Sequence, residues 1–243
     1  MARFFVDEAQ MEGQTILLTG DQAAHARVLR LKVGETVVVC DGRTQECVCV
    51  VENVLDGSYE LRVTDRRPIS TEPAVKVSVY MAFSKGDKLE HVIQKATELG
   101  AAEIVAFPTS RCVSKPDDKS LQKKLERWNK IAAAAAEQSS RGIVPQVITL
   151  KSYREAIDRA MQADLPILFY ENERCTTLQD ALSESAFDSV SLMTGPEGGL
   201  DPQEVQLAVE KGMRVCTLGT RILRCETAPL CALSAVMYHT GEF

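Results

Sequence analysis

From residue 75 onward, short apolar runs alternate with helical patterns, and this alternation sets the fold class of most of the chain. The apolar runs lie at 76–83, 104–107, 167–170, 190–194 and 215–218. Helices are predicted between them, most clearly at 87–99, where apolar residues recur at helical spacing and Gly100 follows. Strands that are apolar on both faces and separated by helices are typical of a parallel sheet, so we expect an α/β fold.

The first 70 residues have a different pattern. Short strands are predicted at 36–40, 47–51 and 59–64, after a helix around 22–29, with glycine-containing turns between them. Closely spaced strands of this kind favour a small β-barrel. Pro68 and Pro73 then interrupt the pattern, and we expect a barrel domain at 1–70 and an α/β domain at 74–243.

Two loops near the end of the chain each follow a predicted strand. GPEGGL (195–200) follows the run at 190–194, and LGTRILRCETA (218–228) follows the run at 215–218. Between them, Asp201-Pro202-Gln203-Glu204 predicts a capped helix start. Ligands of parallel sheets bind beyond the carboxyl ends of the strands, so we expect both loops to border one crevice, although each glycine motif alone is compatible with a plain turn.

The absence of several well-known motifs limits the class of ligand that the two loops could bind. There is no Walker A sequence, no Gly-x-Gly-x-x-Gly and no Gly-x-Ser-x-Gly. Triphosphate hydrolysis, an ordinary dinucleotide site and a serine hydrolase elbow are therefore not indicated. A nucleoside-like ligand, held by backbone groups and by apolar walls such as Leu218, Ile222 and Leu223, suits the two loops better.

Cysteine, histidine and charge patterns set further limits. The eight cysteines include no Cys-x-x-Cys pair and the three histidines are far apart, so we expect reduced thiols and no metal site. An early acidic residue, Asp7, and the lack of a membrane-length apolar run predict a cytoplasmic protein without membrane contact. The net charge is −6, yet basic residues are in excess at 111–141 and at 25–32, which favours a local nucleic-acid patch.

Four segments together resemble the RsmE family, the 16S ribosomal RNA uracil-N3 methyltransferases of the SPOUT class. They are GPEGGL, LGTRILRCETA, AEQSSR (136–141) and HARVLRLKVGE (25–35). The resemblance implies a PUA-like RNA-binding barrel, followed by an α/β domain whose deep trefoil knot, near 190–232, binds S-adenosyl-L-methionine. It also implies a homodimer that methylates uridine 1498 of 16S rRNA in the small ribosomal subunit. Threaded chains are so rare that the knot rests on the resemblance alone.

The resemblance also implies site residues. Thr220 and Cys225 depart from it, since many members have proline and threonine there. The cofactor is expected at Phe169, Tyr170, Glu171, Thr194, Gly195, Pro196, Glu197, Gly198, Leu218, Gly219, Ile222, Leu223, Arg224, Thr227 and Ala228.

Methylation at uracil N3 requires that the N3 proton leave, so a base, or cations that stabilise the developing oxygen charge, must be close. We expect Arg221 or Arg224 to steady the uracil carbonyl or a phosphate, and Glu226 or Glu197 to orient the site. For Glu226 a helix-dipole role at the start of the following helix is an equal alternative.

N3 lies on the Watson–Crick edge, so the target must be unpaired or flipped and the flanking RNA must be held. Candidate RNA contacts are Arg3, His25, Arg27, Arg30, Lys32, Lys85, Lys88, Arg111, Gln138 and Arg141, with Lys115, Lys123 and Lys124 as extensions. A solvated helix face is the alternative for the lysines. Two other functions stay open: a SPOUT enzyme for another rRNA or tRNA position, and a non-catalytic ribosome-assembly protein.

Overall fold

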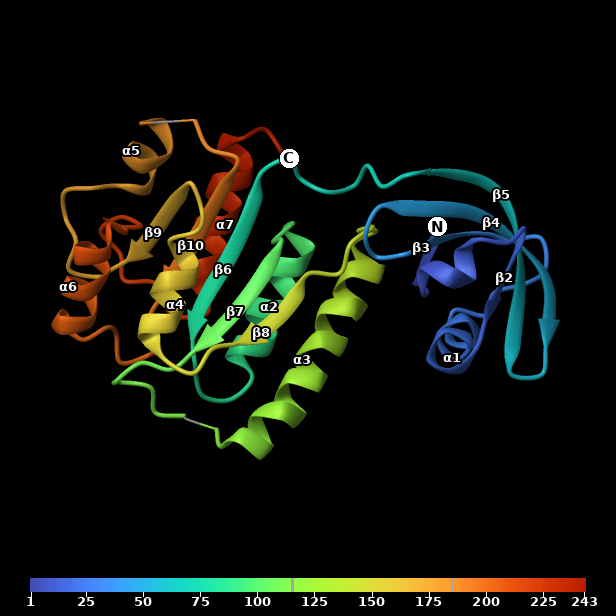
Figure 1. Ribbon diagram of the computed structural model, residues 1–243, viewed down its shortest axis with the longest axis horizontal. Coiled ribbons are helices and arrows are strands. Elements are labelled where there is room, and N and C mark those ends of the chain that lie inside the picture. Colours follow the sequence, from blue (N-terminus) through green and yellow to red (C-terminus); the bar gives the residue numbers. More distant parts are fainter. Residues whose placement is uncertain (115, 185) are drawn as a thin grey trace. The chain divides into compact units, whose positions relative to one another are not determined.

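The structure is a computed structural model that describes residues 1–114, 116–184 and 186–243, without the side chain of residue 118 (Figure 1). It contains two compact units. Unit 1 consists of Met1–Glu72 with Ala136–Val144, and unit 2 consists of Pro73–Ala135 with Pro145–Phe243. Lys115, a candidate RNA contact, lies outside the described residues.

Unit 1 is built on one curled five-stranded sheet in the order β1-β3-β4-β5-β2. Its elements are β1 (Ala2–Phe5), η1 (Glu8–Met11), β2 (Thr15–Leu18), α1 (Gly20–Val28), β3 (Thr36–Cys40), β4 (Gln45–Leu55) and β5 (Ser58–Pro68). The pairs are antiparallel except for β1 with β3. The core includes Phe4, Ile16, Leu18 and Leu61, all fully buried.

The segment Ala136–Val144, which contains AEQSSR, packs with unit 1 although it follows the helix α3 (Asp118–Gln138). Arg141 Nε donates to Glu72 Oε2 at 3.1 Å, and the backbone N–H of Gly142 donates to Glu72 Oε1 at 3.0 Å. Gly142 has no room for a Cβ atom because the Ile69 side chain fills that space. The segment is therefore part of the packed structure of unit 1.

Unit 2 is built on a six-stranded parallel sheet in the order β11-β9-β10-β6-β7-β8, which confirms the predicted α/β class. Its strands are β6 (Lys76–Ala82), β7 (Glu103–Phe107), β8 (Gln146–Thr149), β9 (Leu165–Phe169), β10 (Ser189–Thr194) and β11 (Arg214–Cys216). Its helices, besides α3, are α2 (Lys88–Glu98), α4 (Tyr153–Ala160), α5 (Leu178–Ser183), α6 (Pro202–Lys211) and α7 (Thr227–His239). Helix α7 packs on β6 and β10 and against α2, whereas α4 packs on the same strands and against α6 (Figure 1).

The central strands of unit 2 are buried on both faces, as their apolar runs predict. Ile104 and Val105, on opposite faces of β7, and Leu192 and Met193, on opposite faces of β10, are all fully inaccessible to solvent. Because all six strands run in the same direction, their carboxyl ends meet at one edge of the sheet, where ligands of such folds bind. The knot that the resemblance implies stays a prediction. Among the helices of the described residues, none has the length and apolar character to cross a membrane.

Candidate active site

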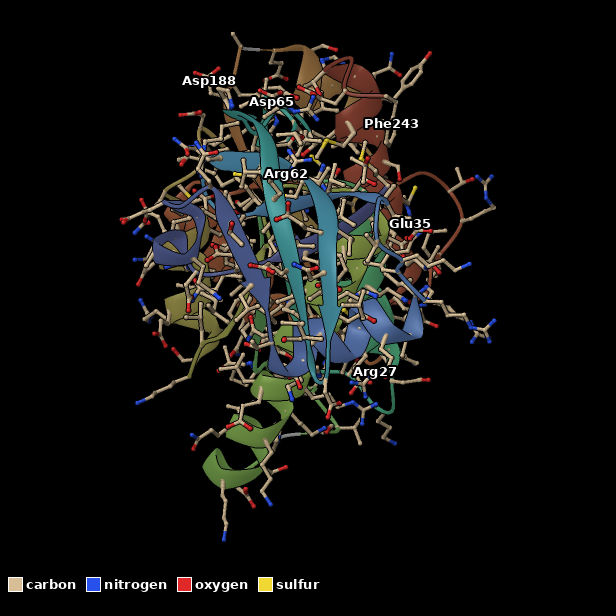
Figure 2. The ribbon with its side chains drawn as sticks, turned by 90° about the vertical axis from the view of Figure 1, so that its right-hand side faces the viewer. Arg27, Glu35, Arg62, Asp65, Asp188 and Phe243 are labelled. Carbon is tan, nitrogen blue, oxygen red and sulfur yellow. The ribbon has the colours of Figure 1, made fainter. Side chains whose placement is uncertain are left out.

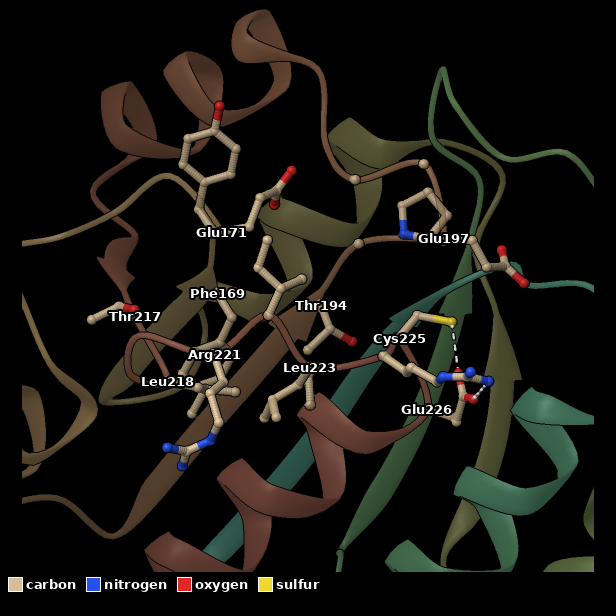
Figure 3. Close-up of a pocket in the computed structure, with 18 of the residues that line it drawn as sticks. Phe169, Glu171, Thr194, Glu197, Thr217, Leu218, Arg221, Leu223, Cys225 and Glu226 are labelled. Carbon is tan, nitrogen blue, oxygen red and sulfur yellow. Dashed lines mark hydrogen bonds and ion pairs between the residues drawn. The ribbon is translucent and has the colours of Figure 1, made fainter.

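A pocket of about 560 Å³ opens at the carboxyl ends of β9, β10 and β11 (Figure 3). Its wall is formed by the loops that follow these strands, together with the start of α2 and α7. GPEGGL and LGTRILRCETA therefore line the same cavity. A volume of this size is in the range of small-molecule sites.

The GPEGGL loop has a backbone that requires glycine at residue 199. Gly199 has a φ angle of +69°, in the left-handed region that side chains disfavour. Its N–H donates to Pro196 O at 3.0 Å, which closes a tight turn. The carboxylate of Glu171 occupies the space beside the Gly199 Cα atom, so that a Cβ atom there would overlap with it. The loop therefore presents bare backbone to the pocket.

Neighbouring loops hold both ends of GPEGGL. Glu197 Oε1 accepts a hydrogen bond from Lys85 N at 2.9 Å. On the other side, Arg111 donates to Gly198 O at 3.4 Å and forms an ion pair with Asp201 at 3.2 Å. The loop is thus tied to the segments that follow β6, the neighbour of β10 in the sheet, and β7, the next strand beyond β6.

The helix start after GPEGGL is present as predicted. Asp201 is the N-cap of α6, its side chain accepts from Gln203 N at 3.0 Å, and Glu204 Oε2 accepts from Asp201 N at 2.9 Å. Pro202 occupies the first helical position. The remaining Glu204 oxygen accepts from Ser110 N at 2.7 Å, so the capping box also secures the loop that carries Arg111.

One side of the pocket holds a compact charged group that we call the Lys88 cluster: Lys88, Glu197, Cys225 and Glu226. Lys88 Nζ lies 3.0 Å from Glu197 Oε1 and 3.8 Å from Glu226 Oε2. Cys225 Sγ donates to Glu226 Oε2 at 3.2 Å and lies 4.0 Å from Lys88 Nζ. Cys225 and Glu226 lie side by side in Figure 3, joined by this contact.

Mutual contacts fix the ionisation of the Lys88 cluster. Burial alone would raise the pKa of Glu197, but the hydrogen bonds from Lys85 N and Lys88 outweigh it and leave that pKa below its usual value. The pKa of Glu226 is also lowered, because hydrogen bonds and the Lys88 charge outweigh burial. The bond to Glu197 raises the pKa of Lys88, while burial and the bond to Glu226 raise the pKa of the Cys225 thiol to about 12. At neutral pH the cluster therefore has one ammonium, two carboxylates and a neutral thiol donor.

The two arginines of LGTRILRCETA lie further out than Lys88. The Arg224 side chain is 84% exposed and its Nη1 lies 4.0 Å from Glu226 Oε1. Arg221 is exposed, and Figure 3 shows its guanidinium group directed away from Cys225 and Glu226. The structure thus brings Arg224 close to Glu226, and places Arg221 at the opposite part of the same loop.

Comparison with known proteins decides the family. Residues 71–237 match a family described as an RNA methyltransferase domain, and residues 18–64 match one described as an RNA methyltransferase PUA domain. A protein of Bacillus subtilis (strain 168), named ribosomal RNA small subunit methyltransferase E, is 37% identical over 99% of this chain and 97% of its own length. The chain belongs to this methyltransferase E family.

Solved structures of methyltransferase E and of a related protein have the same fold. The Neisseria gonorrhoeae methyltransferase E, solved with bound S-adenosyl methionine, superposes with a TM-score of 0.86 at 32% identity. The superposition covers 98% of this chain and 97% of the Neisseria gonorrhoeae chain. A methyltransferase from Legionella pneumophila, also solved with that cofactor, gives a TM-score of 0.86 at 28% identity, with coverage of 98% and 97%.

The residues expected at the cofactor site of the methyltransferase E family gather around the pocket. All of them line it except Thr227, the exposed first residue of α7. The pocket wall also contains residues that were not predicted as cofactor contacts or catalytic residues: Lys88, Arg174, Gly199, Thr217 and Cys225. Gly199 and Cys225 lie inside GPEGGL and LGTRILRCETA, so their position in these motifs could have predicted that they line the pocket. For Arg174 the sequence contains no such signal.

Three basic residues of the predicted RNA patch lie at the end of α1 and just after it. Arg27 is in the last turn of α1 (Figure 2), and Arg30 and Lys32 follow it; all three are exposed. His25 is on the same helix, but its Nδ1 lies 3.0 Å from Glu137 Oε2. The Arg27, Arg30 and Lys32 side chains therefore form the accessible part of the predicted patch.

Two other candidate RNA contacts lie inside unit 1. Arg3 is 7% exposed, and its Nη1 lies 2.7 Å from the buried carboxylate of Glu46. Arg141 is 5% exposed and is paired with Glu72. Each guanidinium compensates a carboxylate that is largely withdrawn from water, so both residues are structural ion-pair partners rather than surface contacts.

The remaining candidates differ in their surroundings. Lys85 and Gln138 are exposed, and Lys123 is exposed on α3 with Lys124 partly covered. Arg111 is exposed, but its guanidinium is held by Gly198 and Asp201 of the GPEGGL segment. We therefore assign Arg111 to the support of that loop.

Proposed function

We propose that this chain is an S-adenosyl-L-methionine-dependent methyltransferase that methylates N3 of one uridine, uridine 1498, in 16S rRNA. The observation that carries the proposal is the pocket between two glycine-bearing loops, in a chain that matches methyltransferase E of Bacillus subtilis over nearly its full length. The solved methyltransferase E from Neisseria gonorrhoeae, which has the same fold, binds this cofactor.

The pocket fits a nucleoside cofactor. Leu218 and Leu223 supply apolar wall, while the backbone of GPEGGL and the Glu171 carboxylate supply polar groups. When bound, the cofactor supplies an activated methyl group. The residues around it have to align the acceptor nitrogen, a proximity effect worth up to roughly 7–11 kcal/mol.

The chemistry at N3 is proposed to take place beside the Lys88 cluster. Glu226 is partly buried at the pocket wall and ionised at neutral pH, so its carboxylate can accept the N3 proton. Its lowered pKa makes it a weak base, and proton loss from N3 therefore also requires a cation that stabilises the deprotonated ring. The exposed Arg224 side chain is proposed to donate hydrogen bonds to a uracil carbonyl or to a neighbouring phosphate. Arg221 is proposed to bind RNA at the outer part of the loop. Arg27, Arg30 and Lys32 of unit 1 are proposed to bind flanking phosphates. The family resemblance further supports a homodimer as the active form.

The proposal is tested by mapping methylated uridines by mass spectrometry in small-subunit rRNA from cells with and without the gene. The expected result is loss of a methyl group on N3 of one uridine, restored when purified protein and cofactor are added to assembled small subunits or naked rRNA. Methylation of another base contradicts the uridine assignment. Failure to bind the cofactor in calorimetry indicates a non-catalytic RNA-binding protein instead.

A further inference from the structure

Lys88 differs from the other cations of the pocket in its environment. Among the described residues, the basic side chains in the wall are Lys88, Arg174, Arg221 and Arg224. The three arginines are exposed, whereas the Lys88 side chain is 31% exposed. A charge partly withdrawn from water acts more strongly on a nearby charge than one on the open surface. Lys88 is therefore the cation best placed to affect chemistry inside the pocket.

The contacts of Lys88 leave hydrogen-bonding capacity for a ligand. A lysine ammonium has three N–H donors. Within the described part of the chain, Nζ has one hydrogen bond of normal length, to Glu197 Oε1 at 3.0 Å, and a long contact with Cys225 Sγ at 4.0 Å. Glu226 Oε2 lies 3.8 Å away, too far for a hydrogen bond. The ammonium can accordingly donate to a carbonyl oxygen without releasing Glu197.

The position of Lys88 is supported from two elements. Lys88 is the first residue of α2, and Glu197, its hydrogen-bond acceptor, is fixed by the N–H of Lys85 at 2.9 Å. Glu226 is held by the Cys225 thiol at 3.2 Å. A cation positioned in this way between two carboxylates does not have to reorganise when charge develops next to it.

We propose that Lys88 donates a hydrogen bond to a carbonyl oxygen of the target uracil and stabilises the negative charge that arises there, while Glu226 accepts the N3 proton. This inference rests on the proposed function. The two carbonyl groups that flank N3 share the charge of the deprotonated ring, so a cation at either oxygen favours loss of the proton. Lys88, predicted from sequence as an RNA contact, is thereby assigned to catalysis.

The proposed step balances in atoms and electrons. The N3–H bond breaks and its proton passes to Glu226. The nitrogen electron pair forms the new N–CH₃ bond, and the pair of the broken S–CH₃ bond stays on sulfur, which changes from a sulfonium to a neutral thioether. Lys88 gives up no proton and keeps its charge throughout.

The first test needs no turnover. An RNA oligonucleotide with 5-fluorouridine at the target position is bound to the full-length protein without cofactor, and the fluorine NMR signal is followed as pH rises. The fluorine reports the ionisation of N3. With Lys88→Gln, the midpoint should lie about 1 pH unit higher than with the unchanged protein, because a neighbouring cation has been removed. Lys88→Arg should keep the lower midpoint. An equal midpoint for all proteins overturns the proposal.

The second test compares single-turnover rates at saturating RNA and cofactor. Lys88→Gln should lower the rate on the uridine RNA about 100-fold, the effect of removing one donor to a developing oxyanion. On 5-fluorouridine RNA, whose N3 is more acidic and needs less stabilisation, the loss should be less than about 10-fold. Lys88→Arg should restore most of the rate. An equal loss on both RNAs, or a loss only in RNA affinity, overturns the proposal.

The matched control is Lys95→Gln. Lys95 is on the same helix and has a similarly exposed side chain, but it pairs with Glu98 outside the pocket. This variant should resemble the unchanged protein in both tests. If the unchanged protein methylates no uridine, the proposed function fails. If it does and the Lys88 variants do not discriminate between the two RNAs, only the role of Lys88 fails.

Discussion

The carboxylate of Glu171 lies directly against the backbone of Gly199, in the space that a side chain at position 199 would need. The two residues belong to the loops after β9 and β10, which are adjacent strands. The contact therefore couples the shape of the GPEGGL turn to the adjacent loop that follows β9.

A Gly199→Ala substitution should weaken cofactor binding and lower stability. The left-handed backbone alone costs roughly 1–2 kcal/mol for a non-glycine residue, and the overlap with Glu171 adds to it. Calorimetric affinity and thermal unfolding measure the two effects. The control is Gly57→Ala, which has a φ of +80° but no atom near its Cβ position. In a double-mutant cycle, Glu171→Ala should recover part of the Gly199→Ala defect, and strict additivity would contradict the contact.

A Glu226→Gln substitution should slow methyl transfer by about 100-fold, because the amide cannot accept the N3 proton. The amide retains the size of the side chain and can still accept from the Cys225 thiol. Single-turnover rates at saturating cofactor measure the effect, with calorimetry to verify that the cofactor still binds. Glu210→Gln, at an exposed position of α6, is the control. A rate equal to that of the unchanged protein would leave Glu226 with a helix-dipole role.

An Arg141→Ala substitution should destabilise the protein by about 2–3 kcal/mol, because it leaves the Glu72 carboxylate partly buried without its cation. Denaturant unfolding measures this loss. Arg30→Ala, at an exposed position, should change the free energy of unfolding by less than about 0.5 kcal/mol. It should instead weaken the salt dependence of rRNA binding. The slope of the logarithm of affinity against the logarithm of salt concentration should become shallower by about 0.7–0.9, the value for one lost phosphate contact. The reverse pattern would place Arg141, not Arg30, at the RNA surface.

An Asp41→Asn substitution should lower stability in a pH-dependent way. Burial alone would raise the Asp41 pKa, but the N–H groups of Arg43, Thr44 and Gln45 outweigh it, so the folded-state pKa lies below the ordinary 3.8. The stabilisation is therefore complete above pH 3.8 and is lost as pH falls through the lower, folded-state value. We expect the variant to be less stable by about 0.5–1 kcal/mol near neutral pH. The difference should vanish in strong acid, and a constant difference at all pH values would refute the charge-based account.

Local signals in the sequence predict much of the α/β unit. The Asp201–Glu204 capping box and the apolar stripe of α2 depend only on residues within a few positions of each other, and both are present in the structure. The four-residue strands β1 and β2 were not predicted, because their pairing depends on β3 and β5. The short strand β8 was not predicted for the same reason. The helices α4 and α5 were not predicted although both have local signals: Ser152 and Thr177 cap their first turns, and the buried residues of α4 recur at helical spacing.

The site was harder to predict where its charges pair over long distances in the sequence. Lys88 and Glu197 are 109 positions apart, and Arg3 and Glu46 are 43 apart. When the acidic partner of a basic residue is not known, the residue is easily taken for an RNA contact, as the buried Arg3 and Arg141 are in the sequence-based prediction. The two loop motifs could be placed correctly because strand direction alone brings the ends of β10 and β11 to one edge of the sheet.

The packing of Ala136–Val144 with unit 1 has a consequence for dissecting the protein. A fragment that stops at Glu72 contains every strand of the N-terminal sheet, yet it lacks the Arg141 counter-charge and the glycine against which Ile69 rests. No single cut of the chain separates the two units. A transplantable form of unit 1 would have to be made of two pieces, with residues 136–144 rejoined by a designed linker to the end of residues 1–72.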